Sequence, residues 1–427
     1  MEVKPSQKTF KDYKFFWSGQ LFSLFGSTVV YFAITWWITI ETGNPIFISI
    51  ASFLRIISNV IILPFAGVLS DRLNKKKLIL IADSSQVIAT VFLIIFFALN
   101  ITDIYVIFIL ISIRSIFQAI HLPTVNSIIP IMVPKEKLTR INGINFLFTG
   151  IVEITAPFIG ATLLLTLTVN QVLWTDLITF AIALIPLLMV QIPSINDDKE
   201  CEKGKKSFRK DLTIGFKTLK LIPGLLIILI LSMFQNLLIR PITTLTSYYV
   251  NVIHSGSVLD LAIVMGFLQG SMIFGALIIS LKKKWNHQTR IYFIGLMIIN
   301  IGYMMFAFVP TGSIIIIGIS AAVFGLFFPI VNSLYQTMIQ TVVPKDKIGR
   351  ITSIDFALSM AITPVGILGS GFLTEILGLP NLIFYCAIIG MILTLIVWYV
   401  LARKKIDYQY EEFLQNINKD LEEMVIE

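Results

Sequence analysis

Long apolar runs separated by short polar connections follow one another along the whole chain. The runs predict twelve membrane-spanning helices, at residues 15–40, 46–69, 78–99, 104–131, 139–165, 171–192, 222–250, 259–281, 291–309, 313–342, 350–377 and 381–402. A helix needs about 20 apolar residues to cross a bilayer core about 30 Å thick, and the runs reach that length. The pattern therefore predicts an all-α integral membrane protein.

One polar stretch inside the chain is long, and it lies near the middle. It runs from Pro193 to about Leu221 and contains NDDKECEKGKKSFRKD. We expect an N-terminal six-helix bundle (1–192), a cytoplasmic linker (193–221), a C-terminal six-helix bundle (222–402) and a cytoplasmic tail (403–427). Apolar residues recur in the tail at helical spacing with acids between them, which predicts a short amphipathic helix.

The two halves repeat each other in sequence. The stretch PTVNSIIPIMVPKEKLTRINGIN, which starts at Pro123, parallels PIVNSLYQTMIQTVVPKDKIGRITSID, which starts at Pro329. From the Val-Pro-Lys turn onward the offset is a constant 210 residues, so that Asn145 matches Asp355. Repeated six-helix bundles are typical of carriers whose halves rock around a site at mid-membrane. The repeat favours two pseudo-symmetric bundles and alternating access, and it leaves the cargo open.

Composition and charge support a membrane location. Hydrophobic residues make up 56% of the chain and charged residues 14%, against roughly a quarter charged in a soluble domain. All but three of the 33 Lys and Arg residues fall in the termini, the central linker and alternate loops, and the exceptions are Arg55, Arg114 and Arg240. Basic residues concentrate in cytoplasmic loops. We therefore expect a multi-pass protein of the cytoplasmic membrane with both termini in the cytoplasm.

The same residues argue against other classes of protein. The net charge of +8 is spread over short loops, whereas a nucleic-acid-binding protein gathers basic residues on one soluble domain. Cys201 and Cys386 fall on different sides of the interface, and His121, His254 and His287 are too scattered for a metal cluster. We expect no nucleic-acid partner, metal, cofactor or catalytic residue, and therefore no enzyme.

The loop after the second predicted span carries the motif GVLSDRLNKKK, with Gly67, Asp71 and Arg72. The glycine allows close helix contact, and the carboxylate can accept helix-end N–H groups or an Arg of the facing bundle. These three residues are candidates for a conformational latch, and the alternative is a solvated basic loop. The second half has GALIISLKKKW, which keeps Gly275 and lacks the acid. The first motif resembles the signature of the major facilitator superfamily.

Within that superfamily the chain resembles the branch of bacterial drug:proton antiporters that contains twelve-helix macrolide-efflux proteins. The resemblance lies in WSGQLFSL at Trp17, RSIFQAIHLP at Arg114, the VPKEKL turn and GRITSI at Gly349. It implies proton-driven export and an Arg in the fourth helix that takes part in proton transfer. The spacing around Arg114 departs from the usual pattern of that branch, so the role of this Arg stays open.

Charged groups inside spans are the next candidates, because a charge at mid-helix costs about 2.5–3.5 kcal/mol on insertion scales unless it faces protein or water. Arg114 and Glu153 lie at similar distances from the turn between the fourth and fifth spans, and therefore at similar depth. We expect them to pair, with Glu153 binding the coupling proton and Arg114 modulating it. The alternative is a static ion pair that ties two helices together.

A polar lining is expected within an otherwise aromatic and aliphatic cleft. Arg240 precedes Pro241 in the seventh span, where the proline bends the helix. Arg55 lies near the depth of Tyr31, where it either attracts an anionic substrate or extends toward the outer interface. Each of these polar residues could instead make a helix-to-helix hydrogen bond. The candidate lining residues are Tyr31, Arg55, His121, Asn126, Gln235, Asn236, Arg240, Gln269, Asn332 and Gln336.

Four further acids, Asp83, Asp176, Asp355 and Glu375, are predicted near span ends with an interfacial role. Taken together, the patterns predict a monomeric, proton-coupled exporter of an amphipathic, macrolide-like compound. The substrate is a small molecule, and the other partners are protons and lipid. One alternative is a siderophore or metabolite transporter of the same fold, and another is a channel or membrane signalling protein.

Overall fold

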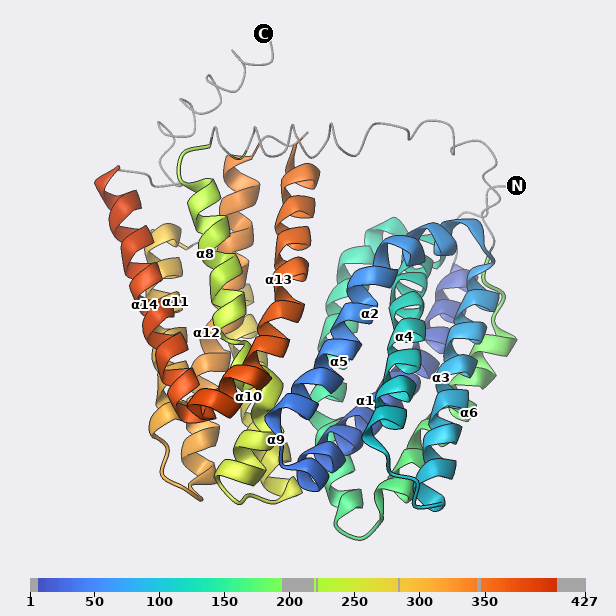
Figure 1. Cartoon of the computed structure of the whole chain (residues 1–427). Helices are drawn as coiled ribbons and strands as arrows, with labels where there is room; N and C mark the ends of the chain where they lie inside the picture. Colours follow the sequence, from blue (N-terminus) through green and yellow to red (C-terminus); the bar gives the residue numbers. More distant parts are fainter. Residues whose placement is uncertain (1–6, 194–218, 220–221, 283–284, 344–346, 405–427) are drawn as a thin grey trace. The chain divides into compact units, whose positions relative to one another are not determined.

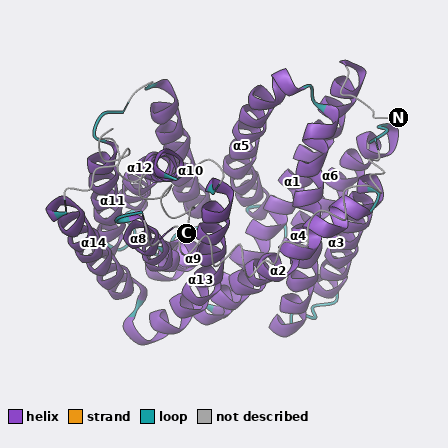
Figure 2. Ribbon diagram, turned by 90° about the horizontal axis from the view of Figure 1, so that it is seen from above, coloured by secondary structure: helices purple, strands orange, loops and turns teal. Residues whose placement is uncertain are grey.

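The computed structural model describes residues 7–193, 219, 222–282, 285–343 and 347–404. Within these ranges all regular secondary structure is helical (Figure 2). The first half contains α1 (Gln7–Thr42), α2 (Pro45–Arg72), α3 (Lys75–Ala98), α4 (Ile104–Met132), η1 (Lys135–Lys137), α5 (Leu138–Leu164) and α6 (Val169–Met189). The second half contains α8 (Leu225–Leu238), α9 (Arg240–Tyr248), η2 (Tyr249–Ile253), α10 (Val258–Leu281), α11 (Gln288–Met305), η3 (Phe306–Phe308), α12 (Ile314–Val342), α13 (Ile348–Leu377) and α14 (Leu379–Arg403).

Twelve helical segments of the described residues are long and apolar enough to cross a membrane, and α8, α9 and η2 together form one of them. The predicted all-helical membrane fold is confirmed. The predicted tail helix and nearly all of the predicted linker lie outside the described residues. Large apolar side chains remain exposed on the helices, among them Phe65, Ile315 and Tyr399. Such surface suits contact with lipid rather than water.

Side-chain caps begin several of the helices where the sequence changes from polar to apolar. Asn44 accepts a hydrogen bond from the Ile46 backbone N–H at 2.8 Å, Asn74 caps α3, and Asp103 caps α4. A cap satisfies N–H groups that a helix start leaves without partners. Lys76, in the first turn of α3, donates to the carbonyls of Leu188 and Val190 and so satisfies backbone acceptors at the C-terminal end of α6.

The chain divides into two compact units. Unit 1 comprises Met1–Asn196 and Thr244–Gly266, and unit 2 comprises Asp197–Thr243 and Phe267–Glu427. The segment Thr244–Gly266 belongs to unit 1, whereas the sequence assigns it to the second bundle. Within unit 1 this segment is held by a hydrogen bond of 2.8 Å from Thr39 to Ser247.

Helix packing follows one scheme in both units. In unit 1, α1 contacts α5 and α6, while α3 contacts α4 and α6 (Figure 2). In unit 2, α8 contacts α13 and α14, while α11 contacts α12 and α14 (Figure 1). The matching helices occupy the same places in the predicted sequence repeat. Gly275 allows a close approach in unit 2, because a Cβ atom at this position would lie 2.7 Å from Pro329 Cγ of α12.

The seventh span is interrupted, as the proline in it predicts. α8 ends at Leu238, and α9 starts at Arg240 with Pro241 at its second position. Leu245 leaves helical geometry, and a π-helical turn follows from Tyr249 to Ile253. Proline lacks the backbone N–H that would continue the hydrogen-bond ladder, which accounts for a break on its N-terminal side.

Candidate functional site

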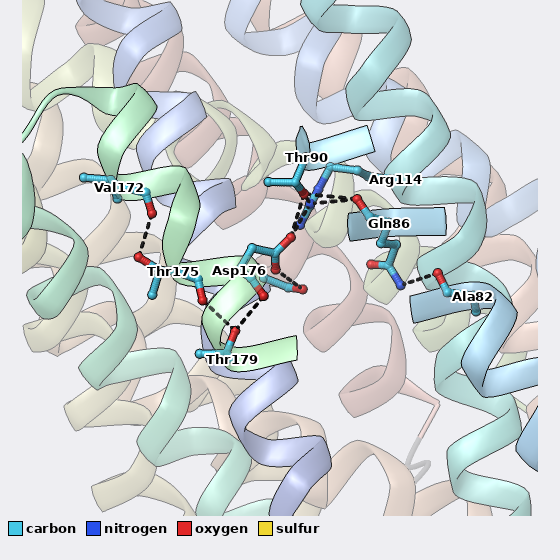
Figure 3. Close-up of polar contacts among 9 residues, drawn as sticks. Ala82, Gln86, Thr90, Arg114, Val172, Thr175, Asp176 and Thr179 are labelled. Carbon is cyan, nitrogen blue, oxygen red and sulfur yellow. Dashed lines mark hydrogen bonds and ion pairs between the residues drawn. The ribbon is translucent and has the colours of Figure 1, made fainter. Parts of the chain in front are cut away.

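Arg114 of α4 forms a buried ion pair with Asp176 of α6 in the core of unit 1. Arg114 Nη1 lies 2.6 Å from Asp176 Oδ2, and the side chains are 10% and 5% exposed. Thr90 of α3 donates to the same carboxylate oxygen at 2.6 Å and also contacts the guanidinium, and Ser27 of α1 donates to Oδ1 at 3.3 Å. Figure 3 shows the Arg, Thr and Asp side chains converging from three helices. The pair ties the core of unit 1 together.

The predicted pairing of Arg114 with Glu153 is wrong, because the carboxylate that meets Arg114 belongs to Asp176. Similar depth brings two side chains together only if both also point the same way around their helices. The interfacial role predicted for Asp176 is wrong too, since α6 begins at Val169 and Asp176 lies about two turns inside it. An acid flanked by apolar residues in LWTDLITF is the signal that could have identified it.

A second buried polar cluster lies in unit 1 around His121 of α4. His121 Nε2 lies 3.2 Å from Asp83 Oδ1 of α3 and 2.8 Å from Gln20 Oε1 of α1. The three residues are between 4% and 8% exposed. Asp83, predicted at the interface, is therefore inside the protein, and His121 contacts protein groups rather than an open cavity. Asp83 also interacts electrostatically with Asp176, which connects the two clusters.

The charges of the two clusters can be counted. They contain two carboxylates, one guanidinium and one imidazole. With both acids ionised and the imidazole neutral, the group carries one net negative charge inside the membrane, and one proton on His121 or Asp83 removes it. Sequence reasoning did not connect these two residues.

Arg55 of α2 and Tyr31 of α1 make a further contact in unit 1, and Glu153 of α5 lies within electrostatic range of Arg55. The Arg55 guanidinium lies 4.0 Å from the centroid of the Tyr31 ring, a cation–π contact. Glu153 interacts electrostatically with Arg55. The structure thus brings together Tyr31 and Arg55, as their depth suggests, and gives Glu153 a cationic neighbour other than Arg114.

Unit 2 contains an open cavity of about 540 Å³, called the unit 2 cavity below. Hydroxyl and amide groups from α8, α12 and α13 line most of it. The lining residues are Ser232, Asn236, Asn332, Tyr335, Gln336, Thr352, Ser353, Asp355, Phe356 and Ser359. Three predicted lining residues are in this set, and seven of its members were not predicted.

The remaining predicted lining residues lie elsewhere. Gln235 lines a smaller pocket that shares Asn236 and Asn332 with the unit 2 cavity, and its buried amide donates to the Gly390 carbonyl and to Thr394, both at 2.9 Å. Arg240 donates to Thr363 at 3.2 Å. Tyr31, Arg55, His121 and Asn126 belong to unit 1, and Gln269 is half-buried on α10 outside the cavity. Gln235 and His121 therefore make helix-to-helix contacts, the alternative that the sequence left open.

The side chains of the candidate latch residues Asp71 and Arg72, and the surroundings of Gly67, lie outside the described part of the structure. The described backbone places all three at the end of α2. Among the residues whose positions are described, no group of three or more His, Cys, Asp or Glu side chains could hold a metal ion. The candidate functional features are therefore the buried ionisable groups of unit 1 and the residues that line the unit 2 cavity.

Comparison with known proteins gives a family and several relatives. A family profile described as Major Facilitator Superfamily matches residues 16–366. Macrolide efflux protein A of Streptococcus pyogenes is 26% identical over 368 residues, covering 86% of this chain and 90% of the relative. Macrolide efflux protein A of Enterococcus faecalis is 25% identical over 307 residues, covering 71% of this chain and 94% of the relative. The staphyloferrin A transporter of Staphylococcus aureus is 19% identical over 402 residues, covering 93% of this chain and 98% of the relative.

Solved structures of transporters share the fold. A mutant of the nucleoside transporter NupG superposes with a TM-score of 0.72 at 17% identity, covering 92% of this chain and 99% of that one. A bacterial homologue of the iron transporter ferroportin, in the inward-facing state, superposes with a TM-score of 0.70 at 13% identity, covering 91% and 98%. At such identities the likeness concerns the fold alone.

Proposed function

Because the chain belongs to the Major Facilitator Superfamily, we propose that it exports an amphipathic, macrolide-like compound by alternating access in exchange for protons. The protein is a multi-pass membrane transporter and not an enzyme, and transporters of this family act on small molecules. The observation that carries the cargo class is the similarity to macrolide efflux protein A over 86% of the chain. Membership of a transporter family also argues against the alternatives of a channel or a signalling protein.

Proton coupling is supported by ionisable groups that lie inside spans. Glu153 remains the proposed proton-binding group, now with Arg55 as its cationic neighbour. Protonation of Glu153 would remove its attraction for Arg55 and change the relative free energies of the two transport conformations. Arg114 takes the static role that the sequence offered as an alternative, because its charge is satisfied by Asp176.

The location and the moving parts complete the proposal. The protein lies in the cytoplasmic membrane as a monomer, with both termini on the cytoplasmic side, as the one-sided distribution of Lys and Arg favours. Gly67, Asp71 and Arg72 form the proposed latch that stabilises one conformation. The unit 2 cavity contributes polar contacts to the cargo, including those of Asn236, Asn332 and Gln336.

Transport in cells tests this function. The chain is expressed in a bacterium that lacks its own drug pumps, and accumulation of a compound panel that includes macrolides is measured with and without a protonophore. We expect lower accumulation of amphipathic compounds, reversed by the protonophore. Glu153→Gln should lose this activity at normal expression, and Glu375→Gln, an exposed acid at the end of α13, should keep it. Unchanged accumulation throughout would refute export, and gradient-dependent export by Glu153→Gln would refute its coupling role.

The staphyloferrin A transporter supports the second candidate, a siderophore or metabolite transporter, because that similarity covers 93% of the chain. The same cells distinguish the two. Export of a ferric chelator or of a small metabolite, with no effect on amphipathic drugs, would favour the second function.

A further inference from the structure

Asp355 of α13 is a buried carboxylate that has no cationic partner among the described residues. It is 8% exposed and accepts a hydrogen bond of 2.7 Å from the Tyr335 hydroxyl of α12. In the described part of the chain the acids that contact a basic side chain are Asp176, paired with Arg114, and Asp83, beside His121, both in unit 1. An ionised carboxylate inside a membrane protein is costly unless a positive charge faces it. Among the described residues Asp355 therefore lacks a counter-charge, and a cationic group of a ligand would supply one.

Arg240, the cation in the middle of the seventh span, lies too far away to supply that charge. Arg240 donates to Thr363, which follows Asp355 by eight residues on the same helix. Eight residues correspond to about 12 Å along a helix axis. Within the described part of the chain, the titratable neighbours of Asp355 are two tyrosines, Tyr335 and Tyr292, whose rings stack with centroids 6.2 Å apart. The α8 residues of the cavity wall are uncharged.

Asp355 belongs to the wall of the unit 2 cavity, so a ligand can reach it. The cavity volume of about 540 Å³ is large enough for a substantial part of a drug-sized molecule. Apart from the carboxylate, the wall offers serine, threonine and tyrosine hydroxyls, side-chain amides and the rings of Tyr335 and Phe356. Hydroxyls and amides both donate and accept hydrogen bonds, so they suit a ligand surface rich in hydroxyl groups.

We propose that Asp355 binds a protonated amine of the cargo and that the surrounding hydroxyls and amides bind neighbouring hydroxyl groups, as in an amino sugar. The inference rests on the proposed function and names the charge and the polar chemistry of the cargo for one site. Asp355 would account for a preference for amines over uncharged compounds of the same skeleton. Asn145, which matches Asp355 in the repeat, bonds with Tyr13 and carries no charge, so unit 1 lacks the equivalent site.

Binding to the full-length protein in lipid nanodiscs tests the inference with two probes of one skeleton. The first is a macrolide whose sugar carries a protonated tertiary amine, and the second has an uncharged acetamide in its place. We expect at least tenfold tighter binding of the amine. Asp355→Asn should weaken amine binding at least tenfold and change acetamide binding less than twofold. Asp355→Glu should restore the preference for the amine, and Glu375→Gln, an exposed acid on the same helix, should bind both probes normally.

Several results would overturn the inference. They are equal binding of the two probes by the parent protein, failure of the parent to bind either probe, and an equal loss of both probes in Asp355→Asn. Export measured in cells separates this test from that of the proposed function. Export of amphipathic compounds without amine preference removes the role of Asp355 and leaves the function standing. Asp355-dependent amine binding without any export would refute the proposed export function and leave the binding role of Asp355 standing.

Discussion

Neutralising Asp176 should destabilise unit 1 more than any single change at an exposed acid. In Asp176→Asn, the Arg114 guanidinium stays buried at 10% exposure and loses the carboxylate 2.6 Å away. Breaking a buried ion pair from one side costs about 3–5 kcal/mol. The amide oxygen of Asn can still accept one hydrogen bond, so we expect the lower end, about 3 kcal/mol, which is roughly a 100-fold shift of the unfolding equilibrium.

A double variant distinguishes an unsatisfied charge from poor packing. Arg114→Met combined with Asp176→Leu removes both charges and keeps apolar volume in the space. Replacing a buried pair by apolar residues is often close to neutral. We therefore expect the double variant to be more stable than either single charge deletion, which additive effects cannot produce.

The assay is unfolding of the purified protein in mixed micelles by increasing mole fractions of SDS, followed by the fluorescence of its 6 tryptophans. Glu375→Gln serves as the control for the loss of one carboxylate, and it should unfold like the parent. An unfolding free energy of Asp176→Asn within about 0.5 kcal/mol of the parent would refute the reasoning, since surface changes have effects of that size. A double variant whose loss equals the sum of the single losses would also refute it.

Three further predictions concern other parts of the chain. In the same assay, His121→Leu should cost about 3 kcal/mol, because it leaves Asp83 buried without its partner; a smaller cost than at an exposed acid would contradict this. Gly390→Val should cost about 2 kcal/mol, since its Cβ would collide with a buried amide, whereas Gly369→Ala has open space and should cause no loss. For topology, alkaline phosphatase fused at Gly43 should be active and a fluorescent protein at the C-terminus should fluoresce; inactive phosphatase at that loop would exclude cytoplasmic termini.

The candidate site shows where sequence reasoning succeeds and where it stops. Residue types and depth were enough to identify Arg114 and Glu153 as intramembrane charges and to place Arg55 near Tyr31. They could not identify Asp176 as the partner of Arg114. That choice depends on α3 packing between α4 and α6 and on the direction of each side chain around its helix. A span boundary set two residues too late also moved Asp176 toward the interface.

The sequence by itself determined the spans, since lipid requires about 20 apolar residues per helix and leaves few other solutions. The fourth span, predicted at 104–131, is helix Ile104–Met132. The sequence also determined the repeat and the break at Pro241, because proline cannot donate the next backbone hydrogen bond. Only the tertiary structure decided which buried groups meet: Asp176 with Arg114, Asp83 with His121, and Asp355 with a tyrosine in an otherwise uncharged cavity. These contacts join residues far apart along the chain, so they depend on helix packing and rotation, which local patterns do not encode.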